Sequence, residues 1–287
     1  MTQTAQPAAQ KSTFVRASVP RTLRISVKTL DRVAPSLVAR GALRMWCTPT
    51  HAKPGVHVPG GTRWQLPDGL VGETWGSGPR VYLVHGWGGH RAQMAAFVEP
   101  LVAAGFQVIA YDAPSHGDSG AGGLGRKRSS LVEMVDAIET VIAAHGHAHA
   151  VIGHSLGAAA AALAVLDGTV TDRLVLVAPP AEPVEYTRAF ASAFGFKEST
   201  RQLLLKRMEV LAERSLDTFA VPQRAAGRSD LPPLLVVVDR ADKETDPADG
   251  HLIAESWPDA ELRVSDGLGH RRILRDADTV AAVVDYL

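Results

Sequence analysis

Ser155 is the residue of this chain best placed for covalent chemistry, because of the glycines that flank it. It stands in Gly-His-Ser-Leu-Gly, residues 153–157, between an apolar run at 150–152 and an Ala-rich segment at 158–166. This order predicts a strand, a sharp turn and a helix, with the serine at the apex. Glycines two positions before and after the serine let the strand and the helix pass closely. The pattern therefore predicts a nucleophilic serine.

A serine nucleophile needs a base to take its proton and an acid to orient that base. His270 follows Gly-Leu-Gly after a predicted strand, and we expect it to be the general base, then the general acid. Residues 239–246 follow another predicted strand and contain four carboxylates. Position within this loop favours Asp242 as the partner of His270, and Asp239 is the alternative.

A Gly-rich loop supplies the remaining requirement of acyl transfer. Residues 85–90 read His-Gly-Trp-Gly-Gly-His and follow a predicted strand. Negative charge develops on the substrate carbonyl oxygen in the transition state, and two backbone N–H groups usually stabilise it. We assign these donors to Trp87 and Leu156, and the helix that begins at Leu156 adds its dipole in the same sense.

Other reactive side chains are expected to be structural. Asp112 and His116 lie in a tight loop, where Asp112 would accept backbone N–H groups. The alternating histidines 145, 147 and 149 precede the strand of Ser155, at the end of the sheet away from the predicted site, so we expect no metal there. Cys47 has no motif around it and is expected to pack.

Strands and helices alternate along the chain from residue 80 onward. We expect strands at 81–84, 107–111, 150–152, 173–178, 234–238 and 261–264, and helices at 91–104, 129–145, 156–166, 247–256 and 272–287. Two short antiparallel strands, 62–66 and 70–75, are expected at the edge of the sheet. This alternation predicts an α/β fold, a mostly parallel twisted sheet covered by helices on both faces. Loops that carry chemistry should lie at the carboxyl ends of its strands.

A helical cap is expected where residues 179–232 interrupt this alternation. This segment contains two helix-like stretches, 185–194 and 200–212, and carries apolar side chains along its length. These side chains would line an apolar acyl pocket, which Trp87 would also line, or would form the cap's own small core. They are Phe190, Phe194, Phe196, Leu203, Leu204, Leu205 and Leu211.

An N-terminal extension, residues 1–47, is expected ahead of the main domain at 48–287. Residues 1–20 have the composition of a disordered tail. Residues 21–46 mix apolar side chains with six positive charges and one acid, Asp31, and predict a basic amphipathic helix broken near Pro35. We expect this segment to pack on the main domain or on a partner subunit. Weak contact with an anionic membrane surface is the alternative.

Composition excludes several classes of function. The 287 residues contain 30 Lys and Arg against 30 Asp and Glu, so we expect no nucleic-acid partner. One cysteine permits no internal disulfide, which fits a reducing compartment. No apolar run approaches the roughly 20 residues of a membrane-spanning helix, and the N-terminus lacks the apolar core of a signal peptide. We therefore expect a cytoplasmic protein, and the chemistry above needs no cofactor.

These motifs resemble those of the α/β-hydrolase superfamily over about residues 70–287. The order Ser155, Asp242, His270 is the order of that superfamily. Residues 85–89 are similar to its oxyanion loop. Residues 112–119, Asp-Ala-Pro-Ser-His-Gly-Asp-Ser, resemble its D-x-P-G-H-G-x-S loop, with Ser115 in place of the usual glycine.

Within the superfamily the chain looks most like bacterial carboxylesterases and lysophospholipase-like serine hydrolases. The resemblance implies a serine hydrolase that cleaves a small-molecule carboxylic ester or thioester through an acyl-enzyme on Ser155. Two alternatives remain. The same triad can cleave amides or C–C bonds or transfer acyl groups, and the fold can also serve a slow-turnover ligand-binding receptor or scaffold.

Overall fold

The computed structural model describes residues 19–49 and 57–287, so residues 1–18 of the tail expected at 1–20 lie outside the described residues. Eight strands form one sheet in the order β1-β2-β4-β3-β5-β6-β7-β8. Their bounds are β1 Thr62–Gln65, β2 Val71–Trp75, β3 Arg80–Val84, β4 Gln107–Asp112, β5 Ala148–His154, β6 Thr171–Val177, β7 Leu234–Asp239 and β8 Ala260–Ser265. The pairs β1–β2 and β2–β4 are antiparallel, and the others are parallel. The predicted α/β fold is confirmed.

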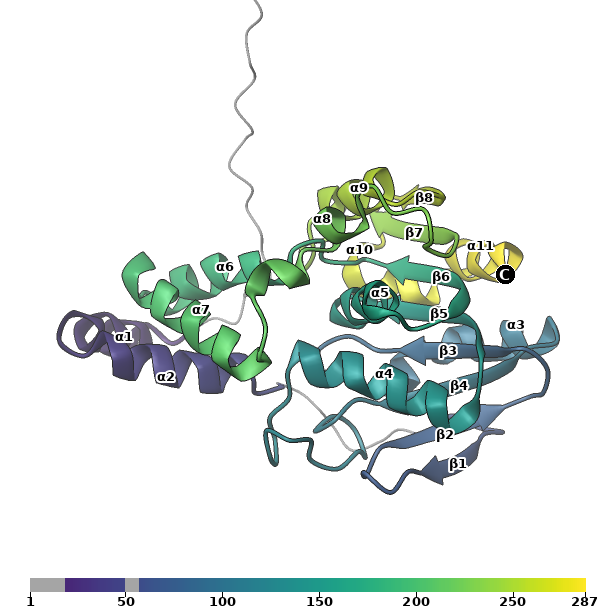
Figure 1. The fold of residues 1–287 in the computed structure, drawn as a ribbon, viewed down its shortest axis with the longest axis horizontal. Coiled ribbons are helices and arrows are strands. Elements are labelled where there is room, and N and C mark those ends of the chain that lie inside the picture. The colour runs from purple at the N-terminus through teal and green to yellow at the C-terminus, as the bar shows by residue number, and fades with distance from the viewer. Residues whose placement is uncertain (1–18, 50–56) are drawn as a thin grey trace, which may run out of the picture.

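Helices cover both faces of this sheet (Figure 1). One face packs on α4 (Leu131–His145), α5 (Leu156–Asp167), α8 (Val221–Ala225) and α9 (Pro247–Ser256). The other packs on the 3-10 helix Arg91–Phe97, on α3 (Val98–Ala103) and on α11 (Ala277–Tyr286). Apolar residues of β3, β5, β6 and β7 point alternately into these two cores, which is why their sequences are almost continuously apolar.

Two expected helices are divided in the structure. The stretch 91–104 is a 3-10 helix followed by α3, because Pro100 has no N–H for a continuous α-helix and fits only in the first turn of α3. The helix expected at 272–287 begins earlier, as α10 (Gly269–Arg272), which is followed by a 3-10 turn at Ile273–Arg275 and then by α11. Asp276 is extended there, and its side chain caps the N–H of Thr279.

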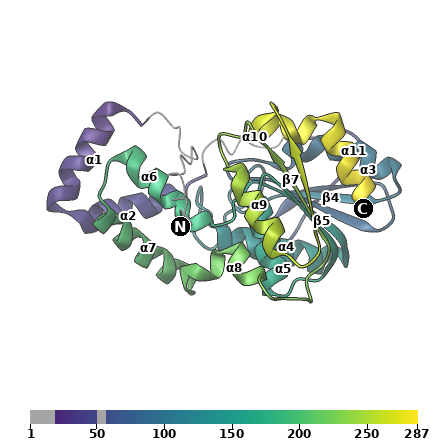
Figure 2. The same cartoon turned by 90° about the horizontal axis from the view of Figure 1, so that it is seen from above.

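Between β6 and β7 the chain forms α6 (Tyr186–Phe194) and α7 (Glu198–Ala212), flanked by 3-10 turns at Pro183–Glu185 and Leu216–Phe219 and followed by α8. The helices α1 (Arg21–Val33) and α2 (Pro35–Trp46) pack against α6 and α7, away from the sheet (Figure 2). The break between α1 and α2 lies at Ala34, directly before Pro35. We call α1 and α2 the N-terminal hairpin.

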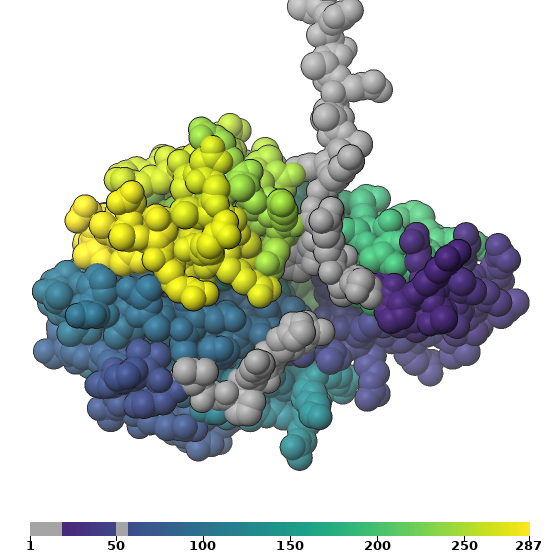
Figure 3. Space-filling view, turned by 180° about the vertical axis from the view of Figure 1, so that it is seen from behind, coloured from purple at the N-terminus to yellow at the C-terminus, as the bar shows by residue number. Residues whose placement is uncertain are grey.

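The N-terminal hairpin and α6–α7 form one lobe beside the main body (Figure 3). Val38 and Ala42 of α2 are buried with Phe190, Phe194 and Leu204. Packing on this chain's own domain, one of the two expected placements of residues 21–46, is thus what the structure shows. No helix among residues 19–49 and 57–287 is long and apolar enough to cross a membrane.

Candidate active site

Ser155 lies at the turn between β5 and α5. Its backbone is strained, with φ 55° and ψ −126°, a conformation that places a side chain at the apex of a sharp turn. A Cβ on Gly153 would lie 2.6 Å from the Cα of Ala158, and one on Gly157 would lie 2.2 Å from the carbonyl oxygen of His85. The flanking glycines are therefore required sterically.

His270 is paired with Asp242. Its Nδ1 lies 2.8 Å from Oδ2 of Asp242, and both side chains are buried. The other carboxylate oxygen of Asp242 accepts the N–H groups of Glu244 and Thr245, at 2.8 and 3.0 Å. Because this loop fixes the carboxylate, His270 keeps its proton on Nδ1 and leaves Nε2 to accept one.

Asp239, the alternative partner of His270, holds a loop instead. Its carboxylate accepts the N–H groups of Leu268 and Gly269, at 3.0 and 2.8 Å, and the hydroxyl of Ser265, at 2.8 Å. Burial raises the pKa of Asp239, but these hydrogen bonds outweigh burial and lower it below its ordinary value. Asp239 thus fixes the loop that precedes His270.

The loop at residues 85–90 closely approaches the serine. A Cβ on Gly86 would lie 2.9 Å from the Cβ of Ser155. Nε2 of His85 accepts the N–H of Ala113 at 3.0 Å, so Nδ1 carries the proton and donates to the carbonyl of Gly86 at 2.7 Å. Burial lowers the pKa of His85 to about 4, which keeps the ring neutral. This pins the peptide whose N–H belongs to Trp87.

Asp112 and His116 have the structural roles expected of them. The carboxylate of Asp112 accepts the N–H groups of Arg91 and Asp118, at 2.7 and 2.8 Å, and also pairs with the guanidinium of Arg91. Nδ1 of His116 hydrogen bonds to the carbonyl of Pro114 at 2.9 Å, and burial lowers its pKa to about 3. In the same loop, Ser115 adopts the left-handed φ of 60° that a glycine would adopt freely.

Two residues that support the site, Arg91 and His154, were not among the predicted site residues. Arg91 is fully buried and also pairs with Glu73 at 3.1 Å. No local pattern marks Arg91, because its partners come from distant strands. Nε2 of His154 donates to the carbonyl of His270 at 2.9 Å, and burial lowers the pKa of His154 to about 3. The position of His154 beside the serine was the available clue.

The alternating histidines 145, 147 and 149, at which no metal was expected, lie at or before the start of β5. His147 lies just before β5 and His149 lies near its first residue. Both hydrogen bond to Asp172 of β6, at the end of the sheet away from Ser155. Within the described part of the chain, no group of three or more His, Cys, Asp or Glu residues could hold a metal ion.

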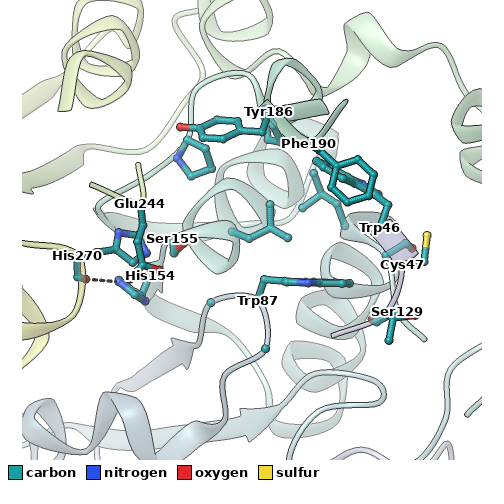
Figure 4. Close-up of a pocket in the computed structure, with 18 of the residues that line it drawn as sticks. Trp46, Cys47, Trp87, Ser129, His154, Ser155, Tyr186, Phe190, Glu244 and His270 are labelled. Atoms are coloured by element: carbon teal, nitrogen blue, oxygen red, sulfur yellow. Dashed lines mark hydrogen bonds between the residues drawn. The ribbon is translucent and has the colours of Figure 1, made fainter. Parts of the chain in front are cut away.

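A cavity of about 1050 Å³ opens beside Ser155. Ser155, His270, Trp87 and Leu156, four of the five predicted site residues, line it. Figure 4 shows Ser155 and His270 at one end, with Trp46 and Cys47 at the other. Burial raises the pKa of Cys47 to about 11, so its thiol stays protonated and is part of the wall rather than a nucleophile.

Five of the seven apolar residues expected in the cap take one or both of the expected roles, whereas Leu203 and Leu205 take neither. Phe190 and Phe194 line the cavity and also pack in the core of the lobe. Leu211 lines the cavity, whereas Phe196 and Leu204 belong to the core alone. The cavity wall and the lobe's core are therefore one continuous apolar cluster.

Comparison with known proteins identifies the family of this chain and solved structures with a similar fold. A family model described as serine aminopeptidase, S33, matches residues 78–225. An esterase from Pyrococcus furiosus is 18% identical with a TM-score of 0.59, covering 84% of this chain and 98% of its own. A monoacylglycerol lipase from Paleococcus ferrophilus is 21% identical with a TM-score of 0.56, covering 76% and 97%. Est816, an N-acyl homoserine lactone degrading enzyme, is 17% identical with a TM-score of 0.61, covering 79% and 100%. No curated protein sequence matches the chain.

Proposed function

The chain belongs to the serine aminopeptidase S33 family of α/β hydrolases, and from that premise we propose that it hydrolyses carboxylic esters or thioesters through an acyl-enzyme on Ser155. The observation that carries the proposal is the buried pair of Asp242 and His270, with His270 and Ser155 lining one largely apolar cavity. The pair supplies a base of fixed orientation, and the cavity supplies a place for an acyl group.

In the first step, Ser155 Oγ attacks the substrate carbonyl carbon while Nε2 of His270 takes the hydroxyl proton. Asp242 stabilises the resulting imidazolium and keeps the proton of Nδ1 in place. The N–H groups of Trp87 and Leu156 hold the oxyanion. The bond from the carbonyl carbon to the leaving oxygen or sulfur then breaks, and the leaving group takes the proton from Nε2.

In the second step, Nε2 of His270 removes a proton from water as the water attacks the acyl-enzyme carbonyl. The tetrahedral intermediate again places its negative charge on the N–H groups of Trp87 and Leu156. The bond to Ser155 Oγ breaks, Oγ takes the proton back, and the carboxylic acid leaves.

The charge around the cavity favours an acyl ester over an aminopeptidase substrate. An α-ammonium group needs an unpaired carboxylate to bind it. Among the described residues that line the cavity, Glu244 is the one carboxylate, and Arg271 already pairs with it at 3.1 Å. We therefore expect uncharged acyl groups to enter in preference to the free N-terminus of a peptide.

Fluorophosphonate labelling and ester hydrolysis test the proposal together. Wild-type protein should take one label and hydrolyse p-nitrophenyl butyrate faster than alanine p-nitroanilide. Ser155→Ala should take no label and lose about 10⁶-fold in kcat. Ser256→Ala, whose hydroxyl bonds to the Ile253 carbonyl in α9, is the matched control and should match wild type. Wild-type protein that is neither labelled nor active would favour a binding protein instead.

A further inference from the structure

The lining of the cavity beside Ser155 reaches from the serine to Trp46 of α2. In Figure 4, Ser155 and His270 lie at one end, Trp87 lies along one side, Tyr186 and Phe190 lie opposite, and Trp46 lies at the far end. An acyl group attached to Ser155 that extends toward Trp46 would pass between the apolar side chains of Trp87 and Phe190. Trp46 is therefore placed to contact the end of a long acyl chain.

The far end of the cavity is firmly held. The rings of Trp46 and Phe190 meet edge to face, with centroids 5.3 Å apart and an interplanar angle of 80°. The carbonyl of Cys47, the next residue along, accepts the N–H of Ser129 from the main domain at 2.8 Å. Trp46 is thus fixed between the cap helix α6 and the main domain.

The N-terminal hairpin is also anchored through the buried side chain of Asp31. Asp31 of α1 is 3% exposed, and its carboxylate accepts the N–H of Lys197, at 3.0 Å, and the hydroxyl of Thr200. These bonds tie α1 to the start of α7. Since Val38 and Ala42 of α2 pack in the same lobe, the hairpin is an integral wall rather than a loose cover.

We infer that the hairpin, which lies outside the family-matched residues 78–225, makes this protein selective for fatty acyl esters longer than butyryl. This inference rests on the proposed ester hydrolysis at Ser155. Trp46 and Phe190 set the upper limit of chain length. Each methylene buried along the cavity improves kcat/KM by about fourfold, which corresponds to about 0.8 kcal/mol. The gain stops where the chain meets Trp46.

A series of p-nitrophenyl esters from acetyl to palmitoyl, at concentrations below micelle formation, tests the inference. In wild-type protein kcat/KM should rise with chain length and then level off or fall. Trp46→Ala should move this turning point to longer chains and raise kcat/KM for the longest esters about tenfold relative to wild type. Leu37→Ala, on the same helix but 56% exposed and away from the cavity, should leave the profile unchanged.

Trp46→Leu, which keeps an apolar contact to Phe190, gives a second variant should Trp46→Ala not fold, and should move the turning point by a smaller step. An unchanged turning point in the folded Trp46 variants, or a wild-type preference for acetyl, would overturn the inference while leaving ester hydrolysis intact.

Calorimetric titration of Ser155→Ala with fatty acids separates this inference from the proposed reaction. Binding should strengthen with chain length, and Trp46→Ala in the same background should extend the range of chains bound. If wild-type protein bound fatty acids in this way but turned over no ester, the proposed reaction would be wrong and the chain-length inference would stand. Fatty-acid affinity that does not depend on chain length would refute the inference.

Discussion

Asp242→Asn should strongly reduce kcat while leaving the fold intact. Oδ1 of Asp242 accepts the N–H groups of Glu244 and Thr245. In the variant, those donors hold the amide oxygen in the same place, so the amide NH₂ faces Nδ1 of His270. Because NH₂ is a donor, Nδ1 has to accept, and the ring proton moves to Nε2. His270 can then no longer take the proton of Ser155.

We expect kcat to fall about 10⁴-fold, equivalent to about 5 kcal/mol of transition-state stabilisation. Thermal stability should change little, because both backbone hydrogen bonds to Oδ1 remain. Initial rates with p-nitrophenyl butyrate and thermal unfolding of the same preparations measure the two effects.

Asp239→Asn is the matched control and should show the opposite pattern. Its carboxylate faces only donors, from Ala241, Ser265, Leu268 and Gly269. An amide NH₂ there leaves buried donors unpaired, at about 1–3 kcal/mol each. The free energy of unfolding should therefore fall by about 2–4 kcal/mol, while the folded fraction keeps most of its kcat. If Asp239→Asn lost more kcat than Asp242→Asn at a temperature where both are folded, our assignment would be wrong.

The stability difference between wild type and Asp239→Asn should also depend on pH. Because the folded protein holds the pKa of Asp239 below its ordinary value, the unfolded chain binds the proton first as the pH falls. The contribution of Asp239 is complete above the unfolded pKa of about 4 and is lost as the pH falls through the lower folded pKa. Denaturant titrations at a series of acidic pH values should show the two proteins converging.

Three further outcomes are expected. Gly157→Ala should lower the free energy of unfolding by about 3 kcal/mol, since its Cβ would lie 2.2 Å from the carbonyl oxygen of His85; unchanged denaturant stability would contradict the steric argument. Gly41→Ala lies in the interior of α2 with nothing within 4 Å of the added Cβ, so it should raise the free energy of unfolding by about 1 kcal/mol. A lower denaturant stability of this variant would contradict the open space around Gly41. His154→Leu removes the hydrogen bond to the His270 carbonyl and should lower kcat about tenfold with little change in KM, whereas a change confined to KM would refute a positioning role.

Local patterns were sufficient for most of the sheet and for the turn of Ser155. The strand bounds agree with the predicted runs to within a few residues. For β3, β5, β6 and β7 this is because burial of both faces imposes a continuous apolar stretch. Gly153 and Gly157 are required because an added Cβ would clash with atoms close by. For Gly153 these atoms belong to the same turn, and for Gly157 they lie at the end of the adjacent strand β3. The division of two helices was harder to predict from the sequence. Pro100 and Asp276 interrupt the helical backbone without changing the spacing of the apolar residues.

The choice of Asp242 was favoured by its place in the loop, but the structure alone shows what each carboxylate contacts. Asp239 is the last residue of β7. A turn follows, in which the N–H of Asp242 donates to the carbonyl of Asp239 at 3.0 Å. This turn places the side chain of Asp242 against the ring of His270. The buried Arg91 and its contacts to Glu73 and Asp112 were invisible in sequence, because they join three separate elements.

By itself, the sequence determined the α/β alternation and predicted Ser155 as the nucleophile and His270 as its base, since these inferences depend on residue types at short, regular spacings. It also showed that residues 21–46 form an amphipathic segment, because apolar and basic residues recur at helical intervals. Only the tertiary structure decided what that segment covers. The contact of Trp46 with Phe190, and so the length of the cavity, depends on the packing of two segments far apart in the chain. Such contacts follow from the whole topology, which no local pattern encodes.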